Sequence, residues 1–140
     1  MKVNPINNLN TNTNTNFGKL KSINCLNING LWSKCACNSN GEKIANELRK
    51  LACENIFFKE YDVKAFINIK CYEGATLLMK CKPVAKSMSD KIKNIFKPDR
   101  IVRLHNNSRC SDDSTYFLAK QIRDLRLEEN KNQLFDMISG

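Results

Sequence analysis

The chain contains no long apolar run, since none approaches the roughly 20 residues that a helix needs to cross a bilayer. Its 5 glycines stand singly, so it has no glycine-rich loop of the kind that cradles phosphates. His105 is the single histidine, and its spacing from Cys110 matches no known Cys–His nucleophile. We therefore expect no enzymatic activity, no cofactor, no bound metal and no membrane partner.

Cysteine is abundant, with 7 residues, but the number is odd and the spacings are irregular. Nothing in residues 1–16 resembles a signal peptide, because that segment has no apolar run of the required length. We therefore expect a reducing, cytoplasmic environment in which most thiols are small buried hydrophobic residues. A zinc site is the alternative, although the usual Cys-x-x-Cys pair is absent. Its four ligands would be Cys35, Cys37, His105 and Cys110.

The composition is that of one globular domain behind a polar tail. The chain has 140 residues, of which 41% are hydrophobic and 26% charged, and both fractions are ordinary for a folded protein. Its beginning is rich in Asn and Thr, with too little apolar surface to offset the entropy lost on ordering. The sequence thus predicts a disordered tail over residues 1–18 and a single domain over residues 19–140.

Acidic residues are few in comparison with basic ones: 14 Asp and Glu face 23 Lys and Arg, which gives a net charge of +9 at pH 7. Such a charge favours an acidic partner, nucleic acid above all. The basic charge is concentrated between residues 76 and 109, whereas residues 110–140 are net acidic. A Lys-rich and Asn-rich composition also follows from an AT-rich genome, so charge alone leaves both readings open.

The most regular segment predicts a β-hairpin over residues 63–82. Apolar residues alternate with polar ones on both sides of Tyr72-Glu73-Gly74, which is the pattern of strands with one buried face. A three-residue loop with Gly74 in the left-handed conformation would place Ile67 opposite Met79 and Phe66 opposite Lys80.

The remaining patterns predict helices and strands on either side of this hairpin. Helical periodicity covers residues 42–57 and, after Pro83, residues 84–96. The sequence also predicts a strand over residues 100–105, a helix from about residue 113 and a short helix near residue 134. Near the beginning, Asn29-Gly30 is a two-residue hairpin signal that would pair Leu26 with Ser33.

Together these elements predict an α+β fold, an antiparallel sheet with helices packed on one face. The order β-α-β-β-α-β-α resembles the ferredoxin-like arrangement with an added C-terminal helix. Many functions occur on that topology, so the fold alone assigns none. The RNA-recognition motif uses the same topology, but residues 73–80 lack its aromatic side chains.

The outward face of the hairpin carries basic side chains with aromatic ones between them, a combination that can hold phosphates and stack bases. The predicted 84–96 helix adds a basic stripe, and the following strand adds arginines. We therefore expect a small basic binding protein whose partner is nucleic acid. The alternative is a protein-interaction or inhibitor module that binds an acidic partner or associates with itself. The candidate binding residues are Lys64, Phe66, Lys70, Lys80, Lys82, Lys86, Lys93, Lys97, Arg100 and Arg103.

Overall fold

The computed structural model describes residues 18–26, 32–34 and 39–138. Apart from Gly18, the predicted tail lies outside these residues, as does the predicted turn at Asn29-Gly30. In chain order the elements are β1 (Leu20–Leu26), β2 (Trp32–Lys34), α2 (Ser39–Glu54), α3 (Phe57–Glu60), β3 (Tyr61–Lys70), β4 (Gly74–Pro83), α4 (Met88–Ile95), β5 (Arg100–Asn106), α5 (Ser111–Asp124), the 3-10 helix η2 (Glu128–Asn130) and α6 (Gln133–Met137). The predicted α+β class and the order of the main elements are confirmed.

The sheet has the strand order β2-β1-β3-β4-β5. Strands β3, β4 and β5 form an antiparallel meander, but β1 is parallel to β3, so the sheet is mixed and the expected all-antiparallel pairing is wrong at this one ladder. The reason is the connection: α2 carries the chain back across the sheet between β1 and β3, which suits a parallel pair. The two parallel strands are neighbours, whereas a ferredoxin-like sheet splits them with another strand.

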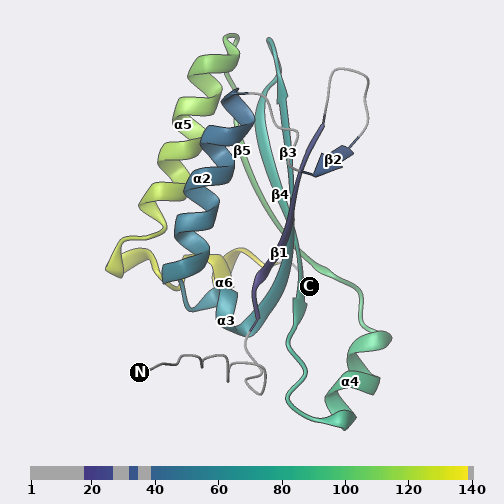
Figure 1. The fold of residues 1–140 in the computed structure, drawn as a ribbon. Coiled ribbons are helices and arrows are strands. Elements are labelled where there is room, and N and C mark those ends of the chain that lie inside the picture. Colours follow the sequence, from purple (N-terminus) through teal and green to yellow (C-terminus); the bar gives the residue numbers. More distant parts are fainter. Residues whose placement is uncertain (1–17, 27–31, 35–38, 139–140) are drawn as a thin grey trace, which may run out of the picture.

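The core lies between the sheet and the helices α2 and α5, which cover the same face side by side (Figure 1). Alternate residues of the strands form the sheet side of the core, and residues spaced three and four apart in the helices form the other side. The fully buried residues include Val63, Ala65, Leu77, Met79 and Val102 from the strands, Ile44, Leu48 and Leu51 from α2, and Leu118 and Ile122 from α5. Among the described residues, no helix covers the opposite face of the β3–β4–β5 sheet (Figure 1).

The hairpin of β3 and β4 has the predicted faces but a different register. Ile67 lies opposite Leu77, and Phe66 lies opposite Leu78, so the predicted pairing of Phe66 with Lys80 is wrong. The loop is Cys71–Glu73, and φ is positive at Tyr72 within it and at Gly74, the first residue of β4. A slip of two residues leaves every side chain on its own face, so the apolar pattern cannot detect it.

Two more predictions need correction. Leu26 pairs with Trp32 rather than with Ser33, so the two-residue turn register does not hold between β1 and β2. The helix expected over residues 84–96 covers only Met88–Ile95, because β4 continues through Pro83 and Ser87 caps the helix. Among the described residues, no helix is both long and apolar enough to cross a membrane.

Candidate nucleic-acid interface

The candidate interface is the face of the sheet that points away from α2 and α5. Successive side chains of a strand alternate between faces, so Lys64 and Phe66 of β3 point away from the buried Ala65. The register places Lys64 opposite Lys80 and Leu78 opposite Arg103. Three strands therefore bring cations and apolar side chains together on one surface.

A shallow hollow of about 370 Å³ opens in the middle of this face. The ammonium nitrogen Nζ of Lys80 lies 5.1 Å from the centre of the Phe66 ring, which is within the range of a cation–π contact. Although Phe66 and Lys80 are not directly opposite, they are diagonal neighbours across β3 and β4. The hollow is lined by Phe66, Asn68, Thr76, Leu78, Lys80 and Arg103.

The cations around the hollow are not neutralised. In the described part of the chain, Lys64, Lys80 and Arg103 form no ion pair with a carboxylate, whereas Lys82 lies 3.9 Å from Asp99 at the end of the sheet. Like charges directly opposite each other on neighbouring strands destabilise a sheet, and Lys64 faces Lys80 in this way. An anion bound between them would remove that repulsion.

The other predicted residues lie at or beyond the margins of this face. Lys70 is at the end of β3, opposite Gly74 and outside the hollow. Arg100 pairs with the buried Cys81, so it points to the other side of the sheet. That alternation could have been read from the buried Val102 two residues later.

Three of the predicted lysines belong to the region of α4. Lys86 precedes the helix and lies 3.6 Å from Glu60, and Lys97 follows it. Lys93 is exposed on α4 itself, which projects from the body beyond the end of the sheet (Figure 1). The structure therefore divides the predicted basic surface into a sheet face and a separate helix.

The sequence prediction missed the polar side chains of the hollow. Asn68 and Thr76 face each other across β3 and β4, and Thr76 Oγ1 lies 2.6 Å from Nδ1 of His105 on β5. His105 thus lies in β5, within the predicted strand, and its side chain belongs to the sheet face. The alternation along each strand marks these residues as outward, but their meeting depends on the strand order.

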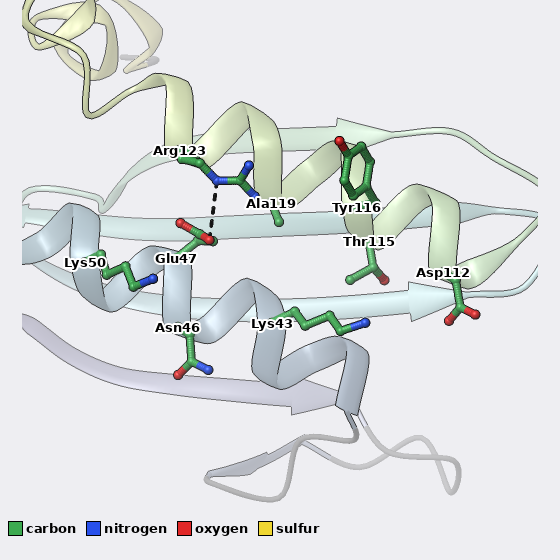
Figure 2. Close-up of a pocket in the computed structure, with 9 residues that line it drawn as sticks. All are labelled: Lys43, Asn46, Glu47, Lys50, Asp112, Thr115, Tyr116, Ala119 and Arg123. Atoms are coloured by element: carbon green, nitrogen blue, oxygen red, sulfur yellow. Dashed lines mark ion pairs between the residues drawn. The ribbon is translucent and has the colours of Figure 1, made fainter.

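A second groove lies between α2 and α5 and has a volume of about 270 Å³ (Figure 2). Glu47 lies between two arginines: its Oε2 is 3.5 Å from Nε of Arg123, and its Oε1 is 3.8 Å from Nη1 of Arg126. Arg126 also binds Glu54 at 2.6 Å. These charges neutralise one another and connect α2 to α5. We therefore interpret them as structural contacts rather than as a binding site.

The described cysteines differ from the expectation that most are buried. Cys81 is a buried free thiol, but Cys53, Cys71 and Cys110 are exposed free thiols, and Cys25 is disulfide-bonded. Burial, with a smaller contribution from the charge of Asp99, raises the pKa of the Cys81 thiol to about 12. In the described part of the chain no cluster of three or more His, Cys, Asp or Glu side chains could hold a metal ion.

This difference predicts a pattern of alkylation. In the folded protein an alkylating reagent at neutral pH should modify Cys53, Cys71 and Cys110 within minutes, because their thiols are accessible. Cys81 should react at least about a thousandfold more slowly, because it must wait for unfolding. Peptide mapping by mass spectrometry measures each site, and a urea-unfolded sample is the control in which all four react. Rapid labelling of native Cys81 would contradict the packing described for β4.

Comparison with known proteins gave no match: no family model matches the chain, and neither a curated protein nor a solved structure matches it. The features of this chain that bear on function are therefore the chemistry of the sheet face and of α4.

Proposed function

We propose that this protein is a non-enzymatic, single-stranded nucleic-acid-binding protein that uses the open face of β3, β4 and β5. The observation that carries the proposal is the pair Lys64 and Lys80, held directly opposite each other with Arg103 on the next strand. Phosphates of a bound strand would lie among these cations. The same surface offers the Phe66 ring and Leu78 as an apolar platform for a base.

A single strand suits this surface better than a duplex does. The hollow is shallow and open, and α4, the helix that projects from the body, lies beyond the end of the sheet rather than over the hollow (Figure 1). Unstacked bases can lie on such a platform, while duplex bases are hidden from it. Asn68, Thr76 and His105 supply hydrogen-bonding groups at the edge of the platform.

We place this activity in the cytoplasm and assign it no cofactor. Three exposed free thiols, Cys53, Cys71 and Cys110, favour a reducing compartment, whereas the disulfide bond of Cys25 points the other way.

The test is a fluorescence-anisotropy titration with single-stranded RNA, single-stranded DNA and a duplex of equal length. Neutralising three phosphates predicts that affinity for a single strand falls by about 20-fold between about 50 and 200 mM salt. The single strands should bind more tightly than the duplex. A Kd weaker than about 100 μM for every oligonucleotide at low salt would refute the proposal.

A further inference from the structure

Helix α4 presents its apolar side to solvent, the reverse of an ordinary surface helix. Met88, Ile92 and Ile95 share one face because they are four and three residues apart, and Phe96 follows beside them. Their exposed fractions are 70% for Met88, 59% for Ile92, 70% for Ile95 and 82% for Phe96. The helix stands away from the sheet on two connecting segments (Figure 1).

Polar contacts fix this orientation. The Ser87 hydroxyl accepts a hydrogen bond from the Asp90 amide at 3.1 Å, and the Asp90 carboxylate accepts one from the Lys86 amide at 3.4 Å. This reciprocal cap stabilises the first turn without help from the core. On the side toward the body, Asn94 is 9% exposed, and its side-chain amide donates to the carbonyl of Pro83 at 3.1 Å. Asn94 therefore faces the protein, and Met88, Ile92 and Phe96 face outward. Ile95 is also exposed, but it borders an open hollow against Lys82 and Pro83.

Lysines flank the apolar stripe on both sides. Lys91 and Lys93 come one residue before and one residue after Ile92, so they lie about 100° to either side of it. With Lys97 they are exposed and form no ion pair within the described ranges. The nearby Asp90 is engaged in the cap, and Asp99 pairs with Lys82. The stripe is thus bordered by uncompensated positive charge.

We propose that α4 docks on an anionic membrane surface. Met88, Ile92, Ile95 and Phe96 would enter the boundary between headgroups and acyl chains, and the flanking lysines would lie among acidic headgroups. This is attachment to one leaflet, which a two-turn helix can make, and not a crossing of the bilayer. It revises the expectation that membranes have no part among the partners, since that expectation considered spanning segments alone.

Area and charge disfavour a second copy of the chain as the occupant. A stable dimer buries about 800 Å² on each partner, which exceeds what four side chains of one short helix can supply. Two copies would also bring their lysines together. An anionic leaflet removes both difficulties, because each additional lysine strengthens its attraction and no large complementary surface is required.

The first test is co-sedimentation of the full chain with vesicles of phosphatidylcholine, with and without phosphatidylserine. Binding should require phosphatidylserine and weaken at high salt. Replacing Ile92 and Ile95 by Ser should lower the vesicle-bound fraction at least about 10-fold, because the apolar contribution is lost. The matched control replaces Tyr116 and Phe117, an exposed apolar pair on α5, by Ser and should bind as the unaltered chain does.

A second readout separates insertion from simple charge attraction. In the Phe96→Trp variant, the difference spectrum against the unaltered chain should shift to the blue with phosphatidylserine vesicles and should be quenched by brominated acyl chains. No binding to these vesicles at low salt would overturn the proposal. So would binding that the Ile92→Ser and Ile95→Ser changes leave intact, or an unshifted tryptophan spectrum in the bound state. The partner of α4 would then be better explained as an acidic protein with an apolar groove that receives the helix.

Discussion

Replacing Phe57 with Ala is expected to lower the free energy of unfolding by about 3–5 kcal/mol. Phe57 is fully buried and packs its ring against three others. It stacks on Tyr61 at 4.7 Å between centroids, and meets Phe135 at 5.0 Å and Phe58 at 5.7 Å edge-on. The cluster joins α3, the start of β3 and α6, so truncation leaves a cavity where three elements meet.

Urea unfolding monitored by circular dichroism measures the effect. Phe96→Ala is the matched control, since the same side chain is removed from an exposed position on α4 and the change should stay within about 0.5 kcal/mol. A loss below about 1 kcal/mol at Phe57 would show that the aromatic cluster is not part of the cooperative core.

The sequence predicted the sheet face on which each side chain lies better than it predicted the cross-strand pairs. Alternation in residues 63–71 and 75–81 placed Ala65, Ile67 and Leu77 correctly on the buried side, and all are buried. The predicted pairs between β3 and β4 differ from the observed ones by two residues. Such a slip leaves the apolar pattern unchanged, so the register depends on the geometry of the loop. The parallel pairing of β1 with β3 depends on contacts distant in sequence, which periodicity does not contain.

Helix α4 shows a second limit of periodicity. The stripe of Met88, Ile92 and Ile95 predicted an amphipathic helix, and an amphipathic helix ordinarily turns its apolar side to the core. Here the hydrogen bond from Asn94 to Pro83 holds the polar side toward the body, and the cap at Ser87 stabilises the helix without core contacts. Neither contact leaves a hydrophobic signal in the sequence.

The sequence predicted the central residues of the candidate site but not how far the site extends over the sheet. Lys64, Phe66, Lys80 and Arg103 do meet, because outward positions on adjacent strands share a face. The sequence could not show that Lys82 is neutralised, because its partner, Asp99, lies on the chain segment that leads into β5. Which cations remain uncompensated is a tertiary property, and it limits the proposed interface to the middle of the sheet.

The double variant Lys64→Glu, Lys80→Glu is expected to lower affinity for single-stranded RNA or DNA by about 100-fold at about 50 mM salt. It removes two phosphate partners and places two negative charges where the strand would lie. Both side chains are exposed, so the fold should be kept. The matched control, Lys43→Glu with Lys50→Glu, makes the same change in net charge on α2, on the far side of the sheet. It should lower affinity by no more than a few-fold.

Phe66→Ala separates stacking from charge at the same surface. If a base lies on this ring, its loss should weaken binding by about 10-fold while the dependence on salt stays unchanged, because no phosphate contact is lost. In the lysine double variant, by contrast, the dependence on salt should flatten. Anisotropy titrations of the variants at several salt concentrations measure both quantities. Equal losses for the sheet-face and α2 charge variants would mean that net charge alone attracts the nucleic acid, and the interface assigned to β3, β4 and β5 would be wrong.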